Sequence, residues 1–173
     1  MDGIRVRAEH PGDFQAIDVV NLSAFECERE AKLVSELRQR PTYSPDLSLV
    51  AEFNGRLVGH LMLTPSSVLC NEEEVSVLLL APMSVVPSQS HRGIGTVLVE
   101  EAITRGRDAN YSAVVVVGKP DYYALHGFKP SNNWGLRCNL PVPDDAVMAI
   151  ELVEGALGSE GMVKYATPFL AMY

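Results

Sequence analysis

The part of the chain best suited to chemistry is residues 78–96, which pass from an apolar run through a short polar loop into an amphipathic segment. The loop carries Gly93 and Gly95, and the pattern predicts a strand, a loop and the first turn of a helix. Backbone N–H groups in such a turn have no intrahelical acceptors and lie at the positive end of the helix dipole, so they suit a phosphate group. Glycines let a ligand approach the backbone closely. The stretch therefore indicates an anion site, and a bare Gly-x-Gly also fits a simple tight turn.

Two better-known phosphate-binding loops do not fit this stretch. A dinucleotide-binding fingerprint needs a third glycine or alanine three positions after Gly95, where the chain has Leu98. A P-loop needs Gly-Lys-Ser/Thr at the start of the helix, and that sequence is not present there. The loop therefore belongs to neither of these classes.

Residues 75–86 form an almost wholly apolar run, which predicts a strand buried on both faces in the middle of a sheet. Pro82 conflicts with a regular central strand because proline donates no ladder hydrogen bond. We therefore expect a β-bulge at residues 82–84, whose unpaired N–H groups and splayed neighbours would open a cleft beside the glycine loop. The alternative is that Pro82 begins a shorter strand.

Local patterns predict a mixed α/β fold around this strand. Asn54-Gly55 separates two β-type runs and predicts a hairpin. Pro65 is expected to interrupt the second of its strands, after which the chain continues in extended form through Val68 and Leu69. Asp13 and Asp121 are expected to cap helices, and the order strand, helix, strand after the glycine loop implies a right-handed parallel crossover. The expected strands are residues 4–7, 47–53, 56–63, 75–86, 113–117, 147–152 and 162–165, the expected helices are residues 14–25, 30–40, 94–110 and 121–126, and a turn is expected at residues 71–74.

Length and composition fit one globular domain, residues 1–173, because 173 residues with 47% hydrophobic content can bury a real core. No run of about 18 apolar residues occurs and the first residues lack the apolar core of a secretory signal, so we expect a cytoplasmic protein without a membrane span. The three cysteines lie far apart, which argues against disulfides and against a metal site. A net charge of -8 disfavours nucleic acid and anionic membranes and suits a cationic substrate.

Two motifs together resemble the GCN5-related N-acetyltransferase (GNAT) superfamily, in its bacterial small-molecule branch. Residues 85–95 resemble its acyl-CoA-binding segment, Gln/Arg-x-x-Gly-x-Gly/Ala, and residues 123–128 resemble its Tyr-x-x-x-Gly-Phe signature. The resemblance implies a central, mostly antiparallel sheet with a parallel, splayed strand pair around the acyl-CoA cleft and helices on both faces. Ser90 departs from the pattern because it stands where the family has Gln or Arg, which should weaken a side-chain contact without removing the site.

The resemblance also implies which residues bind acetyl-CoA, the expected co-substrate, and it implies no metal. Backbone amides of the loop would bind the pyrophosphate, Val85 and Val86 would pair with pantetheine, and Tyr122 would pack against pantetheine or the core. The amide of Val85, exposed by the bulge, would polarise the acetyl carbonyl and stabilise the oxyanion. The implied loop residues are His91, Arg92, Gly93, Ile94, Gly95 and Thr96.

The implied chemistry is direct attack of an amine on the thioester through a tetrahedral intermediate, which expels coenzyme A as a thiolate. Tyr123, the tyrosine of the signature, is the candidate general acid, and the alternative is an aromatic wedge between helix and sheet. No obvious base stands out. His60 is the candidate, with Glu26, Glu28, a water-mediated route and capture of the small free-amine fraction as alternatives.

We therefore expect an acyl-CoA-dependent N-acetyltransferase that acts on the primary amine of a small molecule or peptide. Transfer of a different acyl group is one alternative, and a catalytically idle acyl-CoA-binding or regulatory module is another. Residues 24–45 and 131–143 correspond to segments that set specificity in the superfamily, and they show no pattern that names the acceptor. Edge strands near the C-terminus would allow two protomers to pair as a homodimer.

Overall fold

The computed structural model describes residues 3–173, which form two compact units. The N-terminal unit contains the described residues up to Leu63 together with Ala81–Ala102. The C-terminal unit contains Thr64–Leu80 and Ile103–Tyr173. Two long strands, β3 (Arg56–Cys70) and β4 (Glu73–Val85), contribute residues to both units.

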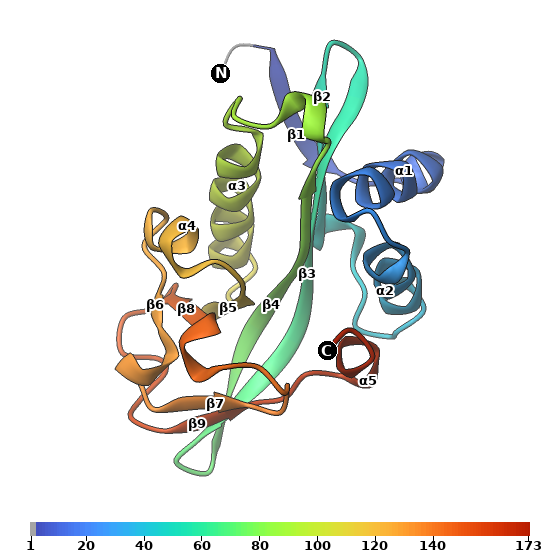
Figure 1. Ribbon diagram of the computed structural model, residues 1–173. Helices are drawn as coiled ribbons and strands as arrows, with labels where there is room; N and C mark the ends of the chain where they lie inside the picture. The colour runs from blue at the N-terminus through green and yellow to red at the C-terminus, as the bar shows by residue number, and fades with distance from the viewer. Residues whose placement is uncertain (1–2) are drawn as a thin grey trace. The chain divides into compact units, whose positions relative to one another are not determined.

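The N-terminal unit is built on an antiparallel arrangement of β1 (Ile4–Ala8), β2 (Ser48–Phe53) and the first part of β3. The turn between β2 and β3 is the predicted hairpin, since Asn54 and Gly55 have φ values of 52° and 74°. Helices α1 (Phe14–Phe25) and α2 (Arg29–Arg38) pack beside each other in this unit (Figure 1). Their apolar side chains and those of the strands form its core, with Ile17, Leu33, Val34, Leu49 and Leu61 fully or almost fully buried.

Helices cover both faces of β3. His60 contacts Asn21 of α1 on one face. The neighbouring residue, Gly59, points to the other face, where an added Cβ would stand 2.9 Å from Ile94 Cγ2 and 3.0 Å from Leu98 Cδ1 of α3 (Ile94–Asp108). Only a glycine at this position allows the first turns of α3 to pack so closely on β3. The close contact fixes how near the amino end of α3 lies to the strand.

The C-terminal unit contains the predicted parallel strand pair. Residues Val77 to Leu80 of β4 pair in parallel with Ala113 to Val116 of β5 (Ala113–Val117). On its other edge β5 pairs antiparallel with β8 (Val147–Glu151), which also pairs with the short β6 (Lys129–Pro130). Strands β7 (Leu136–Cys138) and β9 (Gly161–Val163) run side by side in parallel, and β9 pairs with the end of β3 (Figure 1). Short helices α4 (Pro120–Ala124) and α5 (Thr167–Leu170) complete the unit.

In the described part of the chain the hydrogen-bonded strands follow the order β1-β2-β3-β4-β5-β8-β6, with β9 on β3 and β7 on β9. Among the strand pairs given above, the β4–β5 and β7–β9 pairs are parallel and the others are antiparallel. The prediction of a mixed, mostly antiparallel sheet with a parallel pair is therefore confirmed.

Several details of the predicted elements were wrong. Pro65 does not interrupt β3, which continues from Arg56 to Cys70 and so includes the extended segment expected through Val68 and Leu69. The turn after β3 is shorter than residues 71–74, since Asn71 and Glu72 have positive φ values and β4 already begins at Glu73. Lys119, not Asp121, is the N-cap residue of α4, because Pro120 takes the first helical position. Strands β6 and β7 and helix α5 were not predicted.

Strand β4 runs without interruption through Pro82, so the alternative of a shorter strand starting there is wrong. Its pairing with β5 ends at Leu80, one residue before the cis peptide bond between Ala81 and Pro82. The β-bulge at residues 82–84 stays a prediction.

Candidate active site

The loop before α3 has the geometry of an anion site. The first intrahelical hydrogen bond runs from the Val97 amide to the Gly93 carbonyl at 3.1 Å, so the amides of Ile94, Gly95 and Thr96 precede it and have no acceptor within the helix. The first turn of α3 contains no acidic residue that would neutralise the positive end of the dipole. The structure thus brings together the loop residues that the sequence predicted.

Ser90 has a structural role in this loop. Its hydroxyl donates to the Pro87 carbonyl at 2.7 Å, and its amide donates to the same oxygen at 3.2 Å. These two bonds close the turn that precedes the glycines. A short hydroxyl held in this way does not replace the long Gln or Arg side chain of the motif.

Val85 and Val86 differ in what their backbone groups can bind. The Val86 amide donates to the Val58 carbonyl of β3 at 2.9 Å, and the Val86 carbonyl accepts the Gln89 amide at 2.9 Å. Backbone N–H groups alternate between the two edges of a strand. The amide of Val85 therefore points away from β3, which is the orientation that its predicted role requires.

Tyr123 lies on α4 at the start of the second motif. The signature Tyr-x-x-x-Gly-Phe is a Schellman helix cap here, in which the Phe128 amide donates to the Tyr123 carbonyl at 3.2 Å and Gly127 has a φ of 91°. The Tyr123 ring is packed edge-on against Tyr122 and Phe128, with centroid distances of 5.1 and 5.4 Å. The cap and the rings together fix the direction of the Tyr123 side chain.

Tyr123 is 7% exposed, and among the described residues no group forms a hydrogen bond with its hydroxyl. Burial raises its pKa above the ordinary value of 10.0, and the neighbouring Tyr122 and Tyr173 act in the same direction. The phenol therefore keeps its proton at neutral pH. It is a protonated group whose hydroxyl has no partner within the described protein.

Gly118, directly after β5, leaves the space that the Tyr123 ring occupies. A Cβ at position 118 would lie 2.7 Å from Tyr123 Cε2. We therefore expect Gly118→Ala to lower the free energy of unfolding by about 1–3 kcal/mol, as overpacking does. Urea denaturation of Gly118→Ala in the parent and in a Tyr123→Leu background tests this contact, because the smaller side chain removes the clash. An equal cost in both backgrounds would show that the ring is not what the methyl group meets.

His60, the candidate base, is fully buried on the face of β3 that α1 covers. Its Nδ1 lies 3.4 Å from the Asn21 amide nitrogen, which can only donate, so Nε2 carries the proton and donates to Ser48 Oγ at 2.9 Å. Burial lowers the pKa of His60 to about 4. A neutral imidazole with both nitrogens engaged and no exposed surface is poorly placed to take a proton from an amine. The alternatives Glu26 and Glu28 are exposed between α1 and α2.

A buried charged cluster in the N-terminal unit was not predicted. The Glu9 carboxylate, fully shielded from solvent, accepts hydrogen bonds from Arg38 Nη2 at 2.7 Å, Arg38 Nε at 3.1 Å and the Tyr43 hydroxyl at 2.6 Å. Burial by itself raises the pKa of Glu9, but these hydrogen bonds outweigh it and the pKa lies below its ordinary value. The three residues join the end of β1, helix α2 and the loop after α2.

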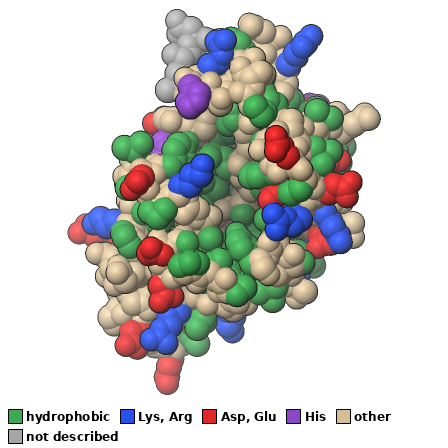
Figure 2. Space-filling view, viewed as in Figure 1, with side chains coloured by type: hydrophobic (Ala, Val, Ile, Leu, Met, Phe, Trp, Pro, Cys, Tyr) green, Lys and Arg blue, Asp and Glu red, His purple; other side chains and the backbone are tan. Residues whose placement is uncertain are grey.

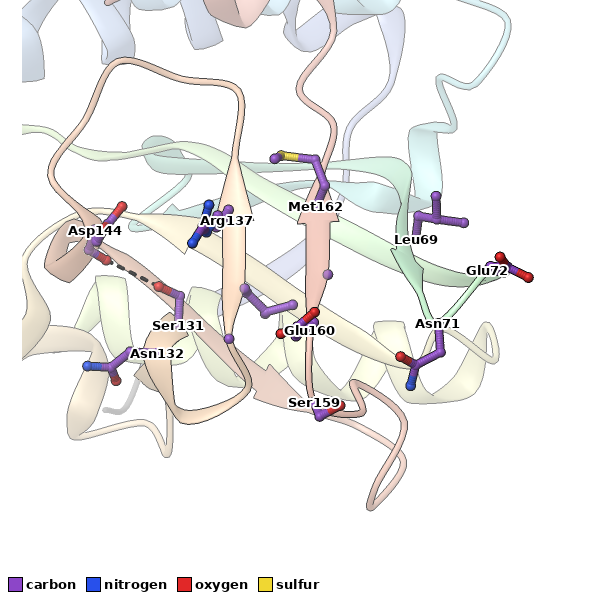
Figure 3. A pocket seen from close by; sticks show the side chains of 13 residues that line it. Leu69, Asn71, Glu72, Ser131, Asn132, Arg137, Asp144, Ser159, Glu160 and Met162 are labelled. Carbon is purple, nitrogen blue, oxygen red and sulfur yellow. Dashed lines mark hydrogen bonds between the residues drawn. The ribbon is translucent and has the colours of Figure 1, made fainter.

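A pocket of about 740 Å³ lies in the C-terminal unit, beside β7, β9 and the turn after β3 (Figure 3). Its charged lining is Glu72, Arg137, Asp144 and Glu160, and the Ser131 hydroxyl donates to the Asp144 carbonyl at 3.2 Å. No residue of either motif lines this pocket. Most of the lining side chains are exposed, so the pocket is an open depression and not an enclosed site.

Within residues 3–173, no cluster of His, Cys, Asp or Glu side chains is arranged to hold a metal ion, and no helix has the length and apolarity to cross a membrane. On the face shown in Figure 2, basic and acidic side chains are interspersed.

The family follows from comparison with known proteins. A model described as the acetyltransferase (GNAT) domain matches residues 5–131. The chain belongs to the GNAT acetyltransferase family. An Escherichia coli GNAT relative, the uncharacterized N-acetyltransferase YhbS, is 32% identical over 95% of this chain and 97% of its own length. A second one, the uncharacterized N-acetyltransferase YjhQ, is 31% identical over 77% of this chain and 74% of its own.

Two solved GNAT structures are similar over nearly the whole chain. The E. coli YhbS structure in complex with CoA has a TM-score of 0.87 at 32% identity and covers 96% of this chain and 91% of that one. A GNAT family acetyltransferase from Brucella melitensis in complex with acetyl-CoA has a TM-score of 0.76 at 29% identity and covers 96% of this chain and 97% of that one. The fold and the acetyltransferase class that the two motifs implied are therefore confirmed.

Proposed function

We propose that the whole chain, residues 1–173, acts as one N-acetyltransferase domain that moves an acetyl group from acetyl-CoA to a primary amine of a small molecule or peptide. The observation that carries this proposal is the amide cradle at the start of α3, in a GNAT chain that resembles relatives solved with CoA and acetyl-CoA. The match of YhbS over almost its full length supports a single functional domain. The strands β3 and β4, which contribute to both units, support it too.

In this proposal the loop residues 91–96 bind the pyrophosphate, mainly through backbone amides. The Val85 amide, directed away from β3, donates to the acetyl carbonyl and stabilises the oxyanion that forms there. Val86 has both backbone groups engaged within the protein, so Val85 is the better placed of the two to pair with the co-substrate. Tyr122 packs against pantetheine.

The reaction proceeds by direct attack. The amine lone pair forms the new C–N bond, the tetrahedral intermediate collapses, and the C–S bond breaks with its electron pair on sulfur. Tyr123 supplies a hydrogen bond and then a proton to this thiolate, and the absence of a partner for its hydroxyl among the described residues supports the role. For the amine proton, the environment of His60 favours a route through water or use of the free-amine fraction.

The acceptor is a cationic amine in its resting form, and the net charge of -8 favours its approach. The cytoplasmic location and the homodimer formed through C-terminal strands stay predictions from the sequence.

Calorimetry with acetyl-CoA, followed by a panel of amines assayed for release of free CoA thiol, tests the proposal. We expect saturable binding of acetyl-CoA and thiol release that depends on one class of amine. No detectable heat at millimolar acetyl-CoA would overturn the proposal. Binding without thiol release over the whole panel would favour the idle module, and faster transfer from propionyl-CoA would favour a different acyl group.

A further inference from the structure

We propose that Phe53 is a positioning residue that holds the guanidinium of Arg92 for a phosphate of acyl-CoA. In this way the pair supplies the side-chain contact that the short Ser90 cannot make. The inference rests on the proposed function, because it concerns the same co-substrate. It assigns a role to a residue of the β2–β3 hairpin, which lies outside both sequence motifs.

The loop itself creates the need for such a pair. Ser90 occupies the position where the motif has a long polar side chain, and its hydroxyl is used for the hydrogen bond to Pro87 at 2.7 Å. Arg92 is two residues later and immediately precedes Gly93, whose carbonyl accepts the first helical hydrogen bond. A cationic side chain therefore starts next to the amide cradle.

Arg92 is exposed, and its guanidinium carbon lies 5.3 Å from the centre of the Phe53 ring. Among the described residues no carboxylate forms an ion pair with Arg92. The guanidinium lies over the ring, and its N–H donors that are directed away from the ring stay free for an anion. A charged group with free donors at the cradle suits a phosphate.

Phe53 is itself held in place. It is the last residue of β2 and pairs with Ile4 of β1 on one side and Arg56 of β3 on the other. A Cβ added at Gly3 would lie 3.4 Å from the Phe53 ring, which places the start of β1 against it. The backbone of Phe53 is thus held between two strands, and a ring that starts from it limits the rotamers open to Arg92 before the ligand arrives.

The test is the affinity of the full chain for acetyl-CoA, with kcat and KM measured separately. We expect Phe53→Leu to raise the dissociation constant and KM by about 3- to 5-fold with kcat unchanged, the size of an exposed cation–π contact. Arg92→Gln is expected to raise them by about 10-fold or more, because it removes charge-assisted hydrogen bonds. The double variant should match Arg92→Gln alone, and Phe53→Tyr should keep the parental affinity.

Arg92→Lys gives a second measurement that does not depend on the hairpin, because it changes only an exposed side chain. It keeps the charge but removes the flat stacking surface, so we expect a decrease in affinity close to that of Phe53→Leu. Phe14→Leu is the matched control, since the Phe14 ring carries Arg38 at 3.8 Å in the same unit and is not expected to affect acetyl-CoA binding.

Additive effects in the double variant, or full affinity in Arg92→Lys, would overturn the inference. A fall in kcat with unchanged KM in Phe53→Leu would overturn it as well. Failure of the parent protein to bind acetyl-CoA would instead remove the proposed function on which the inference rests.

Discussion

Replacing Tyr123 with phenylalanine is expected to lower kcat by about 100-fold or more, the contribution typical of a positioned general acid. The affinity for acetyl-CoA should not change, because the ring contacts with Tyr122 and Phe128 do not involve the hydroxyl. The free energy of unfolding should also stay the same, since the hydroxyl has no hydrogen-bond partner among the described residues. Steady-state kinetics, calorimetry and urea denaturation of the same sample measure the three quantities.

The pH dependence sharpens this expectation. Burial raises the pKa of Tyr123 above 10.0, so the phenol keeps its proton up to that pH and should cause no alkaline loss of kcat there. Tyr165→Phe is the matched control: Tyr165 is equally buried in the same unit, burial also raises its pKa, and it belongs to neither motif. A Tyr123→Phe enzyme that works at the parental rate across the pH range would show that Tyr123 is only an aromatic wedge.

Replacing Glu9 with alanine is expected to lower the free energy of unfolding by about 3–5 kcal/mol, the usual cost of breaking a buried ion pair. The change would leave the Arg38 guanidinium without its carboxylate partner in a site where the Arg38 side chain is only 11% exposed. It would also remove the acceptor of the Tyr43 hydroxyl. Urea denaturation monitored by circular dichroism measures the decrease. The cation–π contact between Arg38 and Phe14 does not replace the missing charge.

The control for Glu9 is an exposed ion pair on the same helix. Lys32 and Glu36 lie 4.0 Å apart on the surface of α2, so Glu36→Gln should cost less than about 1 kcal/mol. The pKa of Glu9 is lowered in the folded state, so its contribution is present above the ordinary value of 4.5 and is lost as the pH falls below it. Equal costs for Glu9→Ala and Glu36→Gln at pH 7 would mean that the buried cluster does not stabilise the fold.

Elements with strong local patterns could be predicted well. The β2–β3 hairpin was predicted because Asn54-Gly55 itself favours the turn. The bounds of β5 match because its five apolar residues are flanked by residues that do not favour a strand, such as Gly118. The helix after the glycine loop was predicted because its amphipathic pattern begins directly after the loop. In each case the physical determinant lies within a few neighbouring residues.

The roles of polar residues were harder to predict because their hydrogen-bond partners can belong to other helices or strands. Asp13 is at the N-cap position of α1 but forms no capping hydrogen bond there. Its carboxylate instead accepts two hydrogen bonds from Arg7 at 2.7 and 2.9 Å and one from the His10 amide, and the arginine lowers its pKa to about 2. A cap can be predicted from the next three residues, whereas an ion pair with a neighbouring strand cannot.

The same reason explains what was missed at the candidate site. Glu9 is 29 residues from Arg38 and 34 residues from Tyr43, and nothing in its local sequence marks it as their partner. The hydrogen-bond partners of His60 are Asn21 and Ser48, and the ring beneath Arg92 belongs to Phe53, all of them distant in the sequence. The motifs indicated which backbone groups are candidates for binding the co-substrate, but the side-chain contacts around them became visible only in the tertiary structure.

The close packing at Gly59 makes the residue types at positions 59, 94 and 98 depend on one another. A methyl group at this position would lie 2.9 Å from Ile94 and 3.0 Å from Leu98. The distance between the amino end of α3 and β3 therefore depends on the missing side chain of Gly59. The same distance fixes how far the backbone amides of the first turn of α3 lie from β3. A larger residue at position 59 would require smaller side chains at Ile94 and Leu98, or it would move the amino end of α3 away from β3.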